Sequence, residues 1–237
     1  MLKPVNLEAY SLEDAWFQAV YATLQHGDKF TIDEGSYAGQ TRLELDYVTI
    51  HIKTPWVLPL LPQLNPALNL PNPVAEEYLN EYLPYLLTDV VKPNEQYTYG
   101  SRIFKAARSQ VQTVIDRYKN GGHRNNQLVL QIAEPEDLWL DDPPCLRQMD
   151  TRIQNGALHF FVYFRSNDLW SGFPANLAAI ETLKQHMAAE LNIRNGQIIY
   201  SSKGLHLYDF CVELAEKVRG KTFEEFRSEA GLSESTK

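Results

Sequence analysis

Strand and helix patterns alternate along the second half of the chain, and this alternation limits the folds that the sequence can adopt. Residues 157–164 and 197–202 are rich in β-branched and aromatic side chains and predict strands. Residues 175–191 between them have apolar side chains at helical spacing, and a helix over 207–219 closed by Gly220 follows. We therefore expect an α/β or α+β fold in which helices pack on a sheet.

The first half of the chain predicts further elements. Ser11 is placed to cap a helix that ends near Gly27. Residues 43–52 predict one long strand, in which a change of parity in the alternation indicates a β-bulge or a sharp twist. The proline-rich and apolar residues 55–73 are expected to be irregular and packed on the body. Three elements complete the prediction: a helix over 74–83, a longer helix that follows Arg102 and stops at Gly121, and a strand over 128–132.

Composition sets the limits for domain number and ligand class. The 237 residues are 44% hydrophobic, which predicts one domain over 1–237 with a polar tail from about residue 228. The formal net charge of −8 argues against nucleic acid as the main ligand, although local arginines can still bind a small anion. Two cysteines do not form a disulfide scaffold, and neither an apolar signal segment nor a membrane-length apolar stretch is evident. We expect a cytoplasmic protein.

Cys145 is the first candidate for chemistry. It follows Pro143 and Pro144, which restrict the backbone and favour a rigid, accessible loop. The nearby Arg147 would favour the thiolate, which is the nucleophilic form of cysteine. The alternative is a buried structural cysteine, and this interpretation fits Cys211 on the apolar face of the last predicted helix.

A second group of candidates follows the predicted strand 157–164. Arg165 and Ser166 lie at its carboxyl end, where α/β sheets often bind ligands, and both side chains suit a phosphate. Asn176 offers a paired donor and acceptor to a base edge. His206 and Tyr208, at the start of the last predicted helix, could bond a sugar hydroxyl. Each residue taken singly also fits an ordinary role as a surface arginine, a helix cap or a packed side chain.

Together these segments resemble thymidylate synthase and its relatives, the pyrimidine-nucleotide hydroxymethylases. The family carries a Pro-Pro-Cys loop, then Arg-Ser-x-Asp-x-x-x-Gly-x-Pro-x-Asn, and later His-x-Tyr. The matching positions are Pro143-Pro144-Cys145, then Arg165, Ser166, Asp168, Gly172, Pro174 and Asn176, and finally His206 and Tyr208. Tyr99-Gly100 is similar to the family's Tyr-Gly turn before a helix, so the resemblance covers roughly residues 97–220.

The resemblance implies a twisted mixed β-sheet with helices packed on it, and a homodimer formed through the sheet face. It implies that Cys145 attacks C6 of the pyrimidine while Asn176 pairs with the O4/N3 edge, and we add Tyr99 and Asp168 to the catalytic residues. The general acid or base is assigned to Glu77 among the glutamates of the helix 74–83. The implied binding roles are Arg165, Ser166 and the partner's Arg124 at the phosphate, His206 and Tyr208 at the ribose, and Asp168, Trp170 and Gly172 on the folate side.

The implied reaction is methylation of dUMP to dTMP with 5,10-methylenetetrahydrofolate as co-substrate and without a metal. Two alternatives stay open: a (d)UMP 5-hydroxymethylase that uses the same folate, and a nucleotide-binding homologue without turnover. They are motivated by three departures from the family pattern. These departures are Leu146 after the cysteine, Asn125-Asn126 in place of an arginine pair, and the polar residues 231–237.

Overall fold

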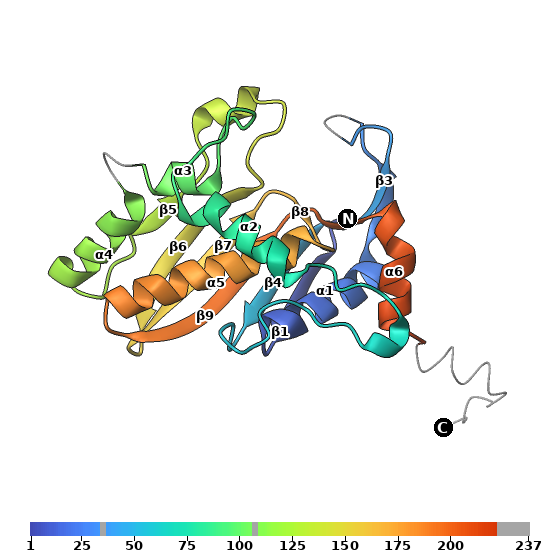
Figure 1. The fold of residues 1–237 in the computed structure, drawn as a ribbon, viewed down its shortest axis with the longest axis horizontal. Coiled ribbons are helices and arrows are strands. Elements are labelled where there is room, and N and C mark those ends of the chain that lie inside the picture. The colour runs from blue at the N-terminus through green and yellow to red at the C-terminus, as the bar shows by residue number, and fades with distance from the viewer. Residues whose placement is uncertain (34–36, 106–108, 222–237) are drawn as a thin grey trace.

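Two β-sheets share one hydrophobic core in this protein (Figure 1). The computed structural model describes residues 1–33, 37–105 and 109–221. The strands are β1 (Pro4–Ala9), β2 (Asp28–Thr31), β3 (Thr41–Leu45), β4 (Tyr47–Ile52), β5 (Val129–Gln131), β6 (Leu146–Gln154), β7 (Ala157–Phe164), β8 (Asn167–Asp168), β9 (Arg194–Ser202) and β10 (Leu205–Tyr208). The helices are α1 (Leu12–His26), α2 (Glu76–Leu87), α3 (Tyr99–Ile103), α4 (Gln110–Gly121), α5 (Gly172–Glu190) and α6 (Asp209–Arg219), with 3-10 turns at Pro66–Leu68 and Pro135–Trp139.

The larger sheet has the strand order β1-β4-β9-β7-β6-β5 and is mixed. β1 runs parallel to β4 and β7 runs parallel to β9, whereas the other neighbours are antiparallel. Helix α5 lies along one face of this sheet, and α2 packs on α5 (Figure 1). Leu177, Ile180 and Leu183 of α5 are buried in the core. The prediction of a twisted mixed sheet covered by helices is confirmed.

The smaller sheet has the order β2-β3-β10-β8 and explains the change of parity in residues 43–52. β3 ends at Leu45 in this sheet, and β4 begins at Tyr47 in the larger one. The chain thus changes sheets at Asp46, and the prediction of one bulged strand was wrong. Leu43, Leu45 and Leu205 lie on alternating positions that face the core side of β3 and β10.

Several predicted helices have different bounds: α2 spans Glu76–Leu87 and not 74–83, and α5 spans Gly172–Glu190 and not 175–191. The helix expected after Arg102 is divided into α3 and α4, and residues 106–108 lie outside the described residues. The last helix begins at Asp209, because residues 205–208 pair with β3 as strand β10. His206 and Tyr208 therefore lie on a strand and not at the start of a helix. The predicted polar tail falls outside the described residues.

The irregular segment 53–75 packs only in part on the body. Leu61 and Leu64 are buried, while Leu58 and Trp56 remain exposed. Ala175 and Ala178 of α5 share a small apolar cluster with Leu61. The segment thereby fixes the position of α2, which leads into the turn at Tyr99-Gly100.

We expect Gly100→Ala to destabilise the protein by about 2 kcal/mol or more, because a methyl group there would overpack the core. A Cβ atom at Gly100 would lie 1.9 Å from the carbonyl oxygen of Thr88 and 2.9 Å from that of Leu86. Gly121→Ala is the matched control, since the same atom would meet nothing within 4 Å. Urea unfolding of both variants measures the difference. Equal stability of the two would contradict the tight contact at Gly100.

Candidate active site

Two arginines fix the loop that precedes Cys145. Arg165 donates to the carbonyl oxygens of Pro143 and Pro144, at 2.5 and 3.2 Å. Arg147 donates to Pro144 at 3.2 Å, and the backbone N–H of Arg165 donates to the carbonyl of Cys145 at 2.8 Å. Cys145, which directly precedes β6, is half-buried and is held at a fixed position beside two guanidinium groups.

A buried carboxylate supports this loop from behind. Asp137 is almost fully buried and accepts hydrogen bonds from Arg102 at 2.7 Å and from Arg147 at 3.4 Å. Breaking such a pair on one side leaves an uncompensated buried charge, which is costly. Arg147 is therefore held between Asp137 and the loop carbonyl of Pro144. On the solvent side, Arg165 lies 3.6 Å from the exposed carboxylate of Asp142.

The surroundings of Cys145 have opposite effects on the pKa of its thiol. Burial raises the pKa of the Cys145 thiol above its ordinary value, and the nearby Asp142 acts in the same direction. Arg165 and Arg147 lower this pKa, as expected from the sequence, but their effect is smaller than that of burial. The prediction of a favoured thiolate is therefore wrong for the free chain, in which Cys145 is a thiol at neutral pH.

Tyrosine side chains surround Cys145 on the side of α2 and α3. Tyr99 is buried, and its hydroxyl accepts from the backbone N–H of Leu146 at 3.4 Å. The hydroxyl of Tyr97 donates to the carbonyl of Asp142 at 3.0 Å. A negative charge on Cys145 would raise the pKa of each of Tyr82, Tyr85, Tyr97 and Tyr99, so all four lie within its electrostatic reach. Of these, only Tyr99 could be identified from the sequence, although Tyr82 and Tyr85 share a helical spacing of three.

Asn176 and Asp168 are brought together at the start of α5. Asn176 is buried, and its carboxamide contacts Tyr82 and Asn167. The Asp168 carboxylate accepts from the backbone N–H groups of Trp170 and Gly172, at 3.0 and 2.9 Å. Asp168 thus stabilises the first turn of α5. The Trp170 ring lies in the core against Trp16, with ring centroids 5.3 Å apart.

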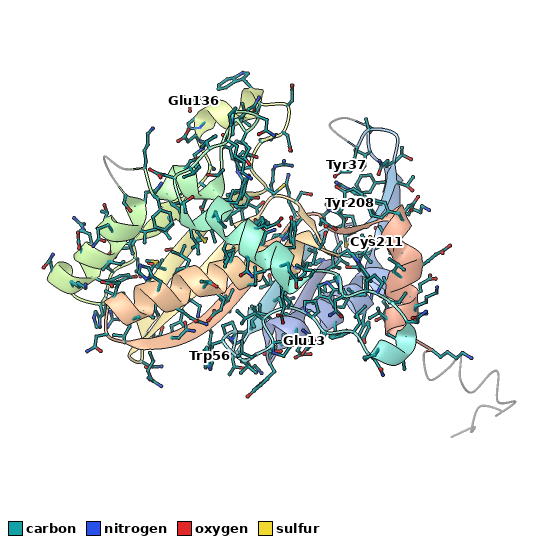
Figure 2. The ribbon with its side chains drawn as sticks, in the orientation of Figure 1. Glu13, Tyr37, Trp56, Glu136, Tyr208 and Cys211 are labelled. Carbon is teal, nitrogen blue, oxygen red and sulfur yellow. The ribbon has the colours of Figure 1, made fainter. Side chains whose placement is uncertain are left out.

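His206 faces Ser166 across the loop between β7 and α5. Its Nδ1 lies 2.9 Å from the carbonyl of Gly204 and 3.4 Å from Oγ of Ser166. Burial lowers the pKa of His206 to about 4, so the ring is neutral and Nδ1 carries the proton that Gly204 accepts. Among the described residues Nε2 has no hydrogen-bond partner and is buried, which leaves an acceptor for a ligand hydroxyl. Figure 2 shows Tyr208 beside Tyr37, with ring centroids 4.8 Å apart.

Arg42 and Glu44 were not recognised in the sequence as site residues. They lie opposite Tyr208 and His206 in the β3–β10 register, and they form an ion pair at 2.7 Å. The positive charge of Arg42 lowers the pKa of both His206 and Cys145, so it faces the same space as the loop. The only signal in the sequence is that both alternate with Leu43 and Leu45 of β3.

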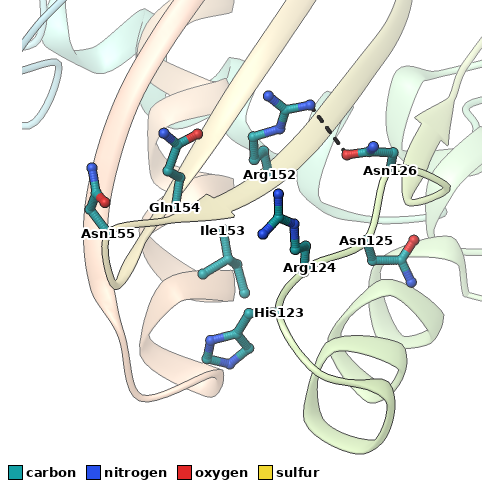
Figure 3. Close-up of a pocket in the computed structure, with 8 residues that line it drawn as sticks. All are labelled: His123, Arg124, Asn125, Asn126, Arg152, Ile153, Gln154 and Asn155. Atoms are coloured by element: carbon teal, nitrogen blue, oxygen red, sulfur yellow. Dashed lines mark hydrogen bonds between the residues drawn. The ribbon is translucent and has the colours of Figure 1, made fainter.

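Arg124 lies away from Cys145 in the same chain. It is exposed in the loop after α4 and lines a cavity of about 450 Å³ at the far end of β6 (Figure 3). Arg152 lines the same cavity and donates to Oδ1 of Asn126 at 3.2 Å. Because Cys145 precedes the first residue of β6 and this cavity surrounds its last residues, one chain does not bring Arg124 to its own Cys145.

Glu77 lies exposed on α2, as do Glu76 and Glu81. A catalytic carboxyl group usually lies in a buried or charged environment that adjusts its pKa. Nothing in the described contacts links Glu77 with Cys145, and its assignment as general acid or base stays a prediction.

A family model described as thymidylate synthase matches residues 86–228, which is more than half of the chain. The chain belongs to the thymidylate synthase family. Proteins named "Putative thymidylate synthase" from Methanosarcina barkeri and Methanococcoides burtonii are each 26% identical over 216 residues, which cover 90% of this chain and 93% of each relative. Thymidylate synthase from Enterobacteria phage T4 is 31% identical over 109 residues, which cover 46% of this chain and 38% of the phage protein.

Membership in the thymidylate synthase family supports one-carbon transfer to C5 of a pyrimidine nucleotide. The matched residues include Cys145, Arg165 and Asn176, whereas Arg42 and Glu77 lie before the match. Within the described ranges, no group of three or more His, Cys, Asp or Glu side chains is arranged to hold a metal ion. The same ranges contain no helix that is long and apolar enough to cross a membrane.

We expect the rate of Cys145 alkylation by iodoacetamide to rise with pH with a midpoint above the ordinary value of 9.0, because only the thiolate reacts. Arg165→Gln removes a charge that lowers the pKa of Cys145, so the midpoint should move to still higher pH. Arg165→Lys keeps the charge and is the matched control. Mass spectrometry of the labelled peptides measures each rate.

Cys211 gives an internal reference in the same experiment. It is buried in α6 (Figure 2), and burial raises its pKa to about 12. We expect Cys211 to stay unlabelled in the folded protein at the pH values used. A midpoint for Cys145 below 9.0, or no change in Arg165→Gln, would contradict the balance described between burial and the arginines.

Proposed function

We propose that this protein transfers a one-carbon unit from 5,10-methylenetetrahydrofolate to C5 of a uridine monophosphate nucleotide, with methylation of dUMP to dTMP as the first candidate. The observation that carries this proposal is the convergence on one site of a cysteine, two arginines and a buried asparagine. Arg165 and Arg147 bond the loop before Cys145, and Tyr82 connects the surroundings of Cys145 with Asn176.

Cys145 serves as the nucleophile in this proposal. Its thiolate adds to C6 of the uracil ring, and the electrons of the C5–C6 double bond move toward O4 to give an enolate. Arg165 and Arg147 oppose the burial that disfavours the thiolate. An N–H of the Asn176 carboxamide stabilises the negative charge that develops on O4. C5 of the enolate is then reactive toward the one-carbon unit.

The phosphate and the ribose of the nucleotide are assigned to residues near Cys145 and Asn176. Arg165 bonds the loop through Nε and one terminal nitrogen, so we assign the phosphate to its other terminal nitrogen and to Oγ of Ser166. His206 accepts from a ribose hydroxyl through Nε2, and Tyr208 lies beside it. We further propose a homodimer in which Arg124 reaches the phosphate bound by the partner subunit, since it lies at the opposite end of β6 from Cys145.

The folate is assigned to the space beside α2. A cleft of about 370 Å³ is lined by Tyr82, Tyr85 and Lys92. Aromatic rings suit a planar pterin, which is the part of the folate that we assign to this cleft. Asp168 and Gly172 stay the predicted contacts at the start of α5. Trp170 is only 9% exposed, so its contact with folate would use its edge or backbone.

Hydroxymethylation is the second candidate, because the same exocyclic methylene intermediate accepts either a hydride from the folate or a water molecule. Asn125-Asn126 in place of an arginine pair and the polar residues 231–237 motivate this candidate. Incubation with dUMP or UMP and methylenetetrahydrofolate, followed by mass analysis, separates the two. Thymidylate together with dihydrofolate supports the synthase, and a 5-hydroxymethyl product without dihydrofolate supports the hydroxymethylase.

An earlier step of the reaction distinguishes both enzymes from a nucleotide-binding homologue without turnover. Release of tritium from C5-tritiated nucleotide requires only the covalent adduct and loss of the C5 proton. Measurable nucleotide binding without tritium release, with and without folate, would replace both enzymes by this alternative. Residues Asn125 and Asn126, where the family has arginines, motivate the comparison.

We expect Cys145→Ser to lose essentially all turnover and still bind nucleotide, because the phosphate and base contacts come from other residues. Cys211→Ala should keep turnover and cost about 1–2 kcal/mol of stability, as expected for a small buried side chain. A 5-fluoro nucleotide with folate should trap a covalent adduct on Cys145. An adduct on any other residue, or wild-type turnover of Cys145→Ser, would overturn the mechanism.

We expect Asn176→Asp to shift the preference from uridylate toward cytidylate. The Asn176 carboxamide both donates to O4 and accepts from N3–H of uracil, whereas cytosine presents a donor at N4 that a carboxyl group accepts. The ratio of kcat/KM for the two nucleotides, each tritiated at C5, measures the shift. A wild-type protein that already prefers cytidylate would show that the assignment of Asn176 to the base is wrong.

A further inference from the structure

The carboxamide of Asn176 is held at both ends by side chains from two other elements. The hydroxyl of Tyr82, from α2, donates to Oδ1 of Asn176. Nδ2 of Asn176 donates to Oδ1 of Asn167 on β8 at 3.2 Å. Asn176 is 8% exposed and Asn167 is 3% exposed, so water is largely excluded from the contact between them, whereas Tyr82 is half-buried. Tyr82 lies outside the motifs that carry the family resemblance. It lines the cleft assigned to folate, and no contact with the nucleotide is assigned to it above.

The contacts continue into the sheet. Nδ2 of Asn167 donates to the hydroxyl of Tyr200 on β9 at 3.2 Å, and Tyr200 is fully buried. Burial raises the pKa of Tyr82 and of Tyr200 well above the ordinary value for tyrosine. Both phenols therefore keep their protons at physiological pH. A chain of four neutral groups, Tyr82–Asn176–Asn167–Tyr200, thus runs from α2 through α5 and β8 to β9.

This chain uses half of the hydrogen-bonding capacity of Asn176. A carboxamide has two lone pairs on its oxygen and two N–H bonds on its nitrogen. Tyr82 occupies one lone pair and Asn167 occupies one N–H bond. One acceptor and one donor remain, at positions that the two neighbours fix. Uracil offers a donor at N3 and an acceptor at O4, whereas cytosine offers an acceptor at N3 and a donor at N4.

To pair with cytosine at the same place, the Asn176 carboxamide would have to turn over. Its nitrogen would then face the hydroxyl of Tyr82, and its oxygen would face Oδ1 of Asn167. Asn167 would have to turn as well, and Tyr200 would have to change from acceptor to donor. The Tyr82 proton would lose its acceptor in a buried position, which is unfavourable.

We propose that Tyr82 is a positioning residue whose hydroxyl fixes the orientation of the Asn176 carboxamide and thereby selects uridine over cytidine nucleotides. The proposal rests on the proposed function, since it requires that Asn176 meets the pyrimidine edge. It assigns base specificity to α2, a helix that carries none of the motif residues.

Tyr82→Phe tests the hydroxyl alone, because the phenyl ring keeps the packing of Tyr82 against the apolar cluster of Leu61 and Ala178. We expect the preference for uridylate over cytidylate to fall about tenfold, the effect of one buried hydrogen bond of about 1.4 kcal/mol. The preference is measured twice: as the ratio of dissociation constants by calorimetry, and as the ratio of kcat/KM from tritium release. The binding ratio tests the proposal even if the protein has no turnover.

Tyr118→Phe is the matched control. Tyr118 is also buried, and its hydroxyl bonds a side chain, Oγ1 of Thr151 at 2.9 Å, on an element away from Asn176. It should lower stability without moving the preference. If Tyr82→Phe weakens both nucleotides equally and leaves the ratio unchanged, Tyr82 is only a packing residue and the proposal is overturned.

A double variant separates orientation from other effects. In Asn176→Asp the two carboxylate oxygens are equivalent, so no orientation is left for Tyr82 to select. Tyr82→Phe should therefore leave the nucleotide ratio unchanged in the Asn176→Asp background, which is the result of a complete coupling in a double-mutant cycle. A shift of the same size in both backgrounds would mean that Tyr82 contacts the base itself and would overturn the proposal. If the wild-type protein binds neither nucleotide, this result would instead contradict the proposed function.

Discussion

The backbone hydrogen bond from Arg165 to Cys145 closes the ladder between β6 and β7, and the geometry of the site depends on it. The antiparallel register places Leu146 opposite Phe164, so the residue before β6 and the residue after β7 are neighbours. β7 also runs parallel to β9, and both end at the same edge of the sheet. Three parts of the candidate site therefore meet at the same end of these strands. They are Cys145, the phosphate candidates of the 165–166 loop, and the turn into β10.

Long elements with regular periodicity could be predicted from the sequence. The short strand β1 was missed although the burial of its residues alternates regularly. β7 has the predicted bounds, because its apolar residues alternate or follow one another without a break. β6 was missed, because the register shift between Leu146 and Gln148 puts its buried residues out of phase with simple alternation. α5 begins three residues before the predicted Ala175, at Gly172, whose backbone N–H donates to the Asp168 carboxylate; the N–H of Trp170, just before the helix, donates to the same group.

The residues of the candidate site also fall into those that could be predicted from the sequence and those that could not. Cys145, Arg165 and Asn176 could be found because they stand at fixed spacings within short motifs. Tyr82 and Arg42 could not, because only the packing of α2 on α5 and the pairing of β3 with β10 bring them to the motif residues. A contact between elements leaves no local pattern in a single sequence, whereas a loop between two strands does.

The arginines of the candidate site are paired with carboxylates, in a chain whose net charge is −8. Each arginine near Cys145 already forms an ion pair with a carboxylate: Arg42 with Glu44, Arg147 with Asp137 and Arg165 with Asp142. These contacts hold the guanidinium groups in place before a ligand arrives, so less conformational freedom is lost on binding. They also balance the local charge, and burial then decides the state of Cys145. Because oxidants and alkylating agents attack the thiolate, a cysteine kept as the thiol in the free protein is protected from them. The arginines lower the cost of forming the thiolate. In the proposed mechanism, bond formation to C6 removes that charge from the sulfur as it moves toward O4 and Asn176.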